Sequence, residues 1–164
     1  MAVIKRRSKK AGLPPGSLVY IGDQSIENIR IDIIDYTETE VLEDTVKSLA
    51  DCEVYLARDS VTWINITGLG DIQLLESIGD RFNVSPLMLE DILSTGQRPK
   101  LEDHDEFFFL VLRMLYNKNS ESDMVSEQVS MLVGPNYVIS LQDINGDVFE
   151  PVRKRVRDGK GRIC

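Results

Sequence analysis

Residues suited to nucleophilic or soft-metal chemistry are scarce in this chain of 164 residues, which has two cysteines and one histidine. Cys52 and Cys164 give neither a disulfide framework nor a paired metal-ligand spacing. His104 lies in a polar, acidic run, where a lone histidine is usually structural or solvated. This usage indicates a reducing, cytoplasmic setting and gives no triad or metal cluster on which an enzyme could be built.

The short motifs of common hydrolases and nucleotide-binding proteins are missing too. The sequence has no Gly-x-x-x-x-Gly-Lys-Ser/Thr loop, no His-Glu-x-x-His and no Gly-x-Ser-x-Gly. Its nearest approach to a dinucleotide motif, Gly68-Leu-Gly70-Asp-Ile-Gln73, lacks the third glycine and puts Asp71 where a pyrophosphate would bind. Asp71 instead suits the N-terminus of a following helix. We therefore expect that the protein is not an enzyme.

Basic residues are fewer than acidic ones, and the sequence has no long apolar run. Nineteen basic residues against 27 acidic ones give a net charge of −8. A negative surface argues against nucleic-acid binding and favours cations as partners. The longest purely apolar run, residues 107–112, is far shorter than the about 20 residues that a membrane helix needs. We expect the chain itself to be soluble.

The length and the hydrophobic fraction of 42% predict one domain with one core. Residues 1–11 carry a basic cluster without apolar periodicity and predict a flexible tail before a domain over 12–164. Apolar periodicity and turn residues predict strands at 17–20, 28–36, near 54, 61–67, 106–116, 127–133 and 137–142, and helices at 37–50, 71–82, from 86 and at 150–158. These elements predict an α/β fold with a mixed sheet covered by helices.

Two adjacent carboxylates, Glu90 and Asp91, are the clearest candidate site. Ser85 is a suitable N-cap for their helix and Pro86 a favoured first residue. On a helical wheel the two acids straddle the side opposite the apolar residues, with Leu87 between them. They are either the solvated face of an amphipathic helix or half of a Mg²⁺ site completed by another chain, because Mg²⁺ keeps several waters and takes one or two carboxylates.

A second group of acids occupies residues 102–106. Its members are adjacent and do not follow the every-second-residue spacing of an EF-hand. The run could collect cations, but a charge run of this kind is typical of a solvated loop.

Five blocks, in order along the chain, resemble the CorA family of magnesium transport proteins. They are Thr62-Trp-Ile-Asn-Ile-Thr-Gly68, Pro86-Leu-Met-Leu-Glu-Asp-Ile-Leu93, Gln97-Arg-Pro-Lys100, Ser126-Glu-Gln-Val-Ser130 and Gly146-Asp-Val-Phe-Glu-Pro-Val-Arg153. The resemblance runs from about Gly12 to the last residue. It implies an α/β/α sandwich that forms the cytoplasmic N-terminal domain of a homopentameric transporter for Mg²⁺, which also passes Co²⁺ and Ni²⁺.

The family's stalk helix, two transmembrane helices and Gly-Met-Asn signature do not occur in this chain. We therefore expect a piece of a longer protein, which would meet the cytoplasmic face of the cell membrane through those segments only. In the family the positions of Asp91 and Glu90 belong to regulatory divalent sites between neighbouring subunits, with partner acids on the stalk. The resemblance thus implies a Mg²⁺-sensing domain with weak metal affinity when isolated, as a monomer or weak assembly.

Two alternatives to a magnesium-sensing domain stay open. One is the corresponding domain of a related Zn²⁺ transporter, although the scarcity of histidine and cysteine favours a hard ion. The other is a stand-alone interaction or ligand-binding module that shares the fold.

Overall fold

A computed structural model describes residues 12–20, 29–117, 124–143 and 149–159. The predicted tail, residues 1–11, lies outside the described residues. Seven strands form one sheet in the order β2-β1-β3-β7-β6-β5-β4. Their bounds are β1 Arg30–Tyr36, β2 Val41–Val46, β3 Val61–Thr67, β4 Lys100–Asp103, β5 Phe108–Asn117, β6 Met124–Val133 and β7 Tyr137–Gln142. Strands β3 and β7 pair in parallel and the other neighbours pair antiparallel, so the sheet is mixed as predicted.

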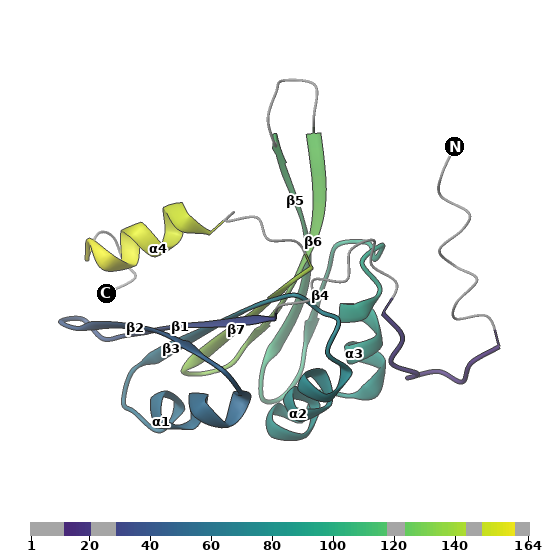
Figure 1. Ribbon diagram of the computed structural model, residues 1–164, viewed down its shortest axis with the longest axis horizontal. Coiled ribbons are helices and arrows are strands. Elements are labelled where there is room, and N and C mark those ends of the chain that lie inside the picture. The colour runs from purple at the N-terminus through teal and green to yellow at the C-terminus, as the bar shows by residue number, and fades with distance from the viewer. Residues whose placement is uncertain (1–11, 21–28, 118–123, 144–148, 160–164) are drawn as a thin grey trace.

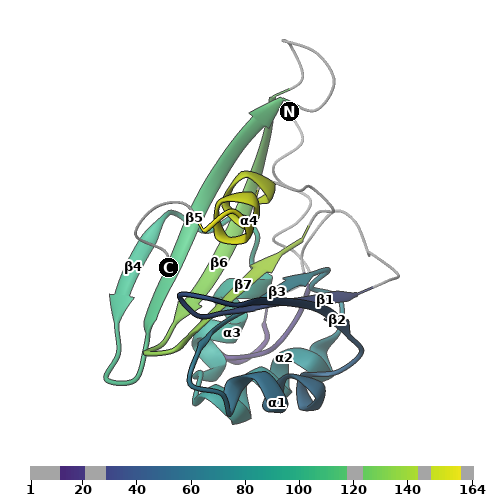
Figure 2. The same cartoon turned by 90° about the vertical axis from the view of Figure 1, so that its left-hand side faces the viewer.

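Helices cover both faces of the sheet, as Figures 1 and 2 show. The 3-10 turn η2 (Leu49–Cys52) and the helices α1 (Glu53–Leu56), α2 (Ile72–Phe82) and α3 (Pro86–Leu93) lie on one face. Helix α4 (Glu150–Arg157) lies on the other. This confirms the α/β/α sandwich, of α+β character because most pairs are antiparallel. None of the helices within the described ranges is long and apolar enough to cross a membrane.

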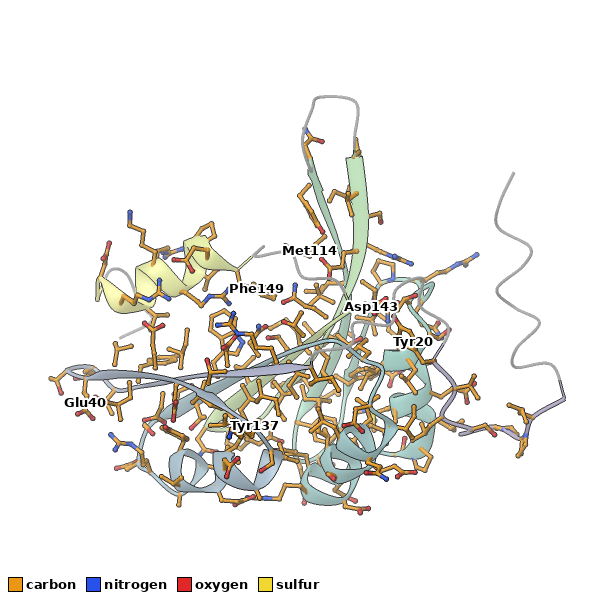
Figure 3. All side chains as sticks on the ribbon, viewed as in Figure 1. Tyr20, Glu40, Met114, Tyr137, Asp143 and Phe149 are labelled. Atoms are coloured by element: carbon orange, nitrogen blue, oxygen red, sulfur yellow. The ribbon has the colours of Figure 1, made fainter. Side chains whose placement is uncertain are left out.

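Buried side chains on the two faces of the sheet form two cores of unequal size. The larger core lies between the sheet and helices α1 to α3, and its fully buried members include Ile64, Leu75, Ile78, Ile92, Leu93 and Ile139. The smaller core lies under α4 and is centred on Ile34, Trp63 and Val156. Figure 3 shows Tyr137 and Phe149 on opposite sides of the sheet. Because β3 is covered on both faces, it reads as a continuous buried run.

The capping residues predicted for α2 and α3 are confirmed. Asp71 is the N-cap of α2, and its carboxylate accepts a hydrogen bond of 3.1 Å from the Leu74 amide. Ser85 is the N-cap of α3 and accepts one of 3.4 Å from the Met88 amide. Each side chain satisfies an amide that the helix itself leaves unpaired.

The helix predicted over residues 37–50 is wrong. Strands β1 and β2 form a hairpin there, and the Thr37 hydroxyl accepts a hydrogen bond of 3.1 Å from the Glu40 amide inside the turn. A Thr-x-x-Glu sequence makes the same local bond at a helix start and in a tight turn, which explains the error. The strand predicted near Val54 is also wrong, because Val54 lies in α1.

Two further predictions about strands need correction. Residues 17–20, predicted as a strand, are described but form none, and the Tyr20 hydroxyl donates a hydrogen bond to Asp143, beside it in Figure 3. The acidic run at residues 102–106 was interpreted as a solvated loop, yet Glu102 and Asp103 belong to β4, which pairs antiparallel with β5. A short, charged strand at the edge of a sheet discourages pairing with other chains, so its composition resembles that of a loop.

The C-terminal end of α3 is held to the sheet by Gln128 of β6, which is 4% exposed. Its amide nitrogen donates to the Asp91 carbonyl at 3.1 Å, and its amide oxygen accepts from the Gln97 amide at 3.0 Å. One side chain thereby joins the helix end, the following loop and a strand. The position of α3 on the sheet is fixed by polar contacts as well as by its apolar face.

Helices α2 and α3 approach closely at Gly79. A Cβ atom added there would lie 2.8 Å from Leu89 Cδ1 and 3.3 Å from the Val84 carbonyl oxygen. Overpacking costs about 1–3 kcal/mol, and the better helix propensity of alanine returns about 0.5–1 kcal/mol. We expect Gly79→Ala to lower the free energy of unfolding by about 1 kcal/mol in urea denaturation. Gly70→Ala, whose Cβ would meet nothing within 4 Å, is the control and should change little.

Replacing Gln128 tests the polar attachment of α3. Gln128→Met keeps the volume of the side chain but removes its hydrogen bonds to α3 and the following loop, so the free energy of unfolding should fall by about 1–3 kcal/mol. Gln73→Met, on the exposed face of α2, makes the same chemical change without such partners. Its free energy of unfolding should lie within about 0.5 kcal/mol of that of the wild type. Equal urea midpoints for the two variants would contradict this role for Gln128.

Candidate functional site

Asp91 lies on the last turns of α3, and both oxygens of its carboxylate are engaged by this chain. Oδ1 accepts a hydrogen bond of 2.6 Å from Gln97 Nε2. Oδ2 accepts one of 2.6 Å from Lys100 Nζ, the first residue of β4. The side chain is 27% exposed, so the carboxylate still reaches solvent. Asp91 is therefore a surface carboxylate with a fixed orientation and a cation beside it.

Lys100 joins Asp91 to a second carboxylate. Its Nζ lies 2.7 Å from Glu102 Oε1 and 5.0 Å from the centre of the Phe109 ring. Partial burial by itself would lower the pKa of Lys100, but the hydrogen bonds to Asp91 and Glu102 outweigh it and the pKa is raised. The same hydrogen bond from Lys100 lowers the pKa of Glu102. The ammonium and the Glu102 carboxylate are therefore both charged at neutral pH.

Glu90 is half-buried and faces the N-terminal segment of the chain. Its Oε2 accepts a hydrogen bond of 2.7 Å from the Gly16 amide. Gly16 has a φ of +83°, and a Cβ atom there would lie 3.1 Å from Pro86 Cβ, so this close contact requires glycine. Glu90 thus anchors residues 12–20 beside the start of α3, a structural contact that the sequence did not reveal.

Leu87 is 57% exposed between the two acids, as the helical wheel predicts. The opposite face of α3 carries Met88, Leu89, Ile92 and Leu93, all buried in the larger core. An exposed leucine beside two carboxylates gives this side of α3 a mixed apolar and acidic surface.

The donor set around α3 suits a hard cation but is incomplete. In the part of the chain that the structure describes, no three histidine, cysteine, aspartate or glutamate side chains converge on a metal position. Glu102, the carboxylate nearest to Asp91 through Lys100, is engaged by that lysine and lies 3.4 Å from His104 Nε2. Any divalent ion at Asp91 would need further ligands from water or from outside the described residues.

Sequence reasoning found the two acids and missed the residues that hold Asp91. Gln97, Lys100 and Gln128 entered only as letters of blocks that resemble a family. A glutamine inside a predicted strand was the available signal for Gln128, because an amide that is buried must find partners. Nothing in the local sequence shows that Lys100 reaches back to Asp91.

The thiol of Cys52 is buried and is no part of this site. Burial, together with Asp51 and Glu53, raises its pKa to about 11. It is therefore protonated at neutral pH, when only the thiolate would bind a metal or attack an electrophile.

A cavity of about 870 Å³ on the other face of the sheet lies between α4 and strands β1 to β3. Charged side chains of both signs line it and pair with one another, for example Arg157 with Glu43 at 2.5 Å and with Glu150 at 2.6 Å. Three arginines and four acids line the cavity, so its net charge is small and offers little attraction to an ionic ligand.

Comparisons with known proteins bear on the whole fold. Residues 58–163 match the model of the CorA-like Mg²⁺ transporter protein family. The chain is 41% identical over 160 residues to the cobalt/magnesium transport protein CorA of Thermotoga maritima. That alignment covers 97% of this chain and 45% of the relative, so the chain spans less than half of the relative's length.

Solved structures share the architecture at low sequence identity. The soluble domain of CorA from Methanocaldococcus jannaschii has a TM-score of 0.55 at 15% identity, covering 86% of this chain and 50% of that one. The cytoplasmic domain of ZntB from Vibrio parahaemolyticus also has a TM-score of 0.55, at 17% identity, covering 81% of this chain and 51% of that one. These similarities establish the fold alone. The family match, which covers most of the chain, shows that the protein belongs to the CorA family.

Proposed function

We propose that this chain is a divalent-cation-sensing regulatory domain of a CorA-like transporter of Mg²⁺ and Co²⁺. Asp91, with Glu90 beside it, supplies this chain's half of an acidic site that a neighbouring subunit completes. The ion at that site is Mg²⁺, or Co²⁺ or Ni²⁺ in its place. The assembly is a homopentamer at the cytoplasmic face of the cell membrane, which it meets through segments beyond the described domain.

The observation that carries this proposal is the placement of the Asp91 carboxylate. It reaches solvent from a helix whose two ends are both fixed, by the Ser85 cap and by Gln128. A ligand on a rigid element can report an ion to the whole domain, because the helix cannot move without disturbing the sheet. A carboxylate that served only solubility would not need this attachment.

The incomplete donor set supports a site shared between subunits. Mg²⁺ demands near-octahedral oxygen coordination and keeps several waters, so one protein carboxylate from each of two subunits is a sufficient protein contribution. Exposed Leu87 beside Asp91 gives the same surface an apolar spot that a neighbouring subunit would cover.

A regulatory mechanism follows from the electrostatics. When Mg²⁺ is plentiful, the ion lies between Asp91 and acids of the adjacent subunit and stabilises a closed, symmetric assembly. When Mg²⁺ falls, like charges face one another across the interface and repel, and the closed state loses population. The chain's net charge of −8 makes such repulsion the default in the absence of cations.

Zn²⁺ transport is the nearest competing function, because the ZntB cytoplasmic domain has a similar fold. The described side chains around Asp91 include the carboxylates of Glu90 and Glu102 and no thiolate, which favours a hard ion over Zn²⁺. The membership in the CorA family disfavours a stand-alone ligand-binding module.

Metal binding at Asp91 can be tested on this chain by ¹⁵N NMR titration with MgCl₂. We expect weak but saturable shifts centred on Glu90 and Asp91, and line broadening of the same amides by Co²⁺. Asp91→Asn keeps the shape of the side chain but removes its charge, so the apparent Kd for Mg²⁺ should rise at least about tenfold.

The matched control is Asp80→Asn, an equal change of charge on the exposed face of α2. It should bind Mg²⁺ like the wild type. Shifts confined to residues 102–106, or an equal Kd for the two variants, would exclude Asp91 as a ligand.

A further inference from the structure

We propose that Lys100 is an internal counter-ion of Asp91 which a divalent cation must displace, so that this lysine sets the ion concentration at which the site responds. The inference rests on the proposed function of Asp91 as a ligand. It adds a residue that contributes no ligand atom to the ion and acts by competing with it.

The competition follows from where the ammonium lies. Lys100 Nζ is 2.6 Å from Asp91 Oδ2, while Gln97 Nε2 is 2.6 Å from Oδ1. A carboxylate oxygen has a second lone pair, so crowding by itself would not exclude an ion. The charges decide: a divalent ion bound to Oδ2 would lie a few ångströms from a fixed positive charge, and like charges at that distance repel strongly.

A second partner makes the displacement reversible. Lys100 Nζ is also 2.7 Å from Glu102 Oε1, and it lies over the Phe109 ring at 5.0 Å. When an ion takes Asp91, the ammonium can move toward Glu102 on its flexible stem without becoming unpaired. The site thus has two arrangements, with Lys100 shared between the acids or with the ion on Asp91 and Lys100 on Glu102.

The arrangement also discriminates by charge. A monovalent cation would only exchange one positive charge at Asp91 for another and would have to break an existing ion pair to do so. A divalent cation interacts with the carboxylate about twice as strongly at equal distance. Lys100 therefore favours divalent over monovalent ions without choosing among the divalent ones.

The decisive experiment compares Mg²⁺ affinities of Lys100→Met and Lys154→Met by ¹⁵N NMR titration of the whole chain. Both variants lose one positive charge, but Lys154 is exposed on α4, on the other face of the sheet. We expect Lys100→Met to bind Mg²⁺ about three- to tenfold more tightly than Lys154→Met. Lys100→Arg keeps the charge and should restore the wild-type affinity.

Removing the second partner should act in the opposite direction. In Glu102→Gln the displaced lysine loses its alternative carboxylate, so it should hold Asp91 more firmly and weaken Mg²⁺ binding about two- to fivefold. If Lys100 only maintained the local structure, Lys100→Met would bind Mg²⁺ more weakly than the wild type. If Lys100 competes with the ion, the same variant binds Mg²⁺ more tightly.

The outcomes also separate this inference from the proposed function. If Lys100→Met binds no more tightly than Lys154→Met while Asp91→Asn still weakens binding, Asp91 is a ligand and the competition is refuted. If no variant, Lys100→Met included, shows a saturable response at Asp91, the proposed site fails and the inference fails with it.

Discussion

The parallel pairing of β3 with β7 is the constraint on which the rest of the structure depends. These strands join two antiparallel halves of the sheet, β2-β1-β3 and β7-β6-β5-β4. A buried chain of hydrogen bonds reinforces the pair: Trp63 Nε1 donates to Ser140 Oγ at 2.9 Å, and Ser140 Oγ donates to Asn65 Oδ1 at 2.7 Å. Such a network is costly unless every member is satisfied, so it specifies the register of the two strands.

That pairing also determines where the candidate site lies. Between β3 and β7 the chain forms α2, α3 and three antiparallel strands, and both helices cover the same face of the sheet (Figure 1). Helix α3 therefore ends beside β6, where Gln128 reaches it, and the chain continues directly into β4 with Lys100. The surroundings of Asp91 thus come from three elements that only the finished sheet brings together.

The sequence predicted the elements whose signal lies in their own residues. It failed where one local sequence suits two different structures. Caps, apolar stripes and buried runs identified β3, β7, α2, α3 and α4, because each is decided by its own residues. The hairpin at residues 37–40 was mistaken for a helix start, since Thr37 makes the same bond in either setting. The acids of the site were predicted from the helical wheel of α3. Their partners, Lys100 and Gln128, lie on other elements, 9 and 37 positions along the chain from Asp91, and no periodicity reveals such contacts.

A surface carboxylate can act as a sensor only when its affinity for the ion is intermediate. An isolated exposed aspartate binds Mg²⁺ too weakly to respond, and a cage of acids would bind it at all concentrations. Pairing Asp91 with Lys100 gives an intermediate affinity for the ion. The Asp91 side chain stays oriented without an ion, yet any ion must compete with the lysine. Glu102 lowers the cost of that competition by retaining the displaced lysine. In the proposed sensor, the response range is set within one subunit by the balance of two ion pairs, and the neighbouring subunit is proposed to supply the remaining ligands.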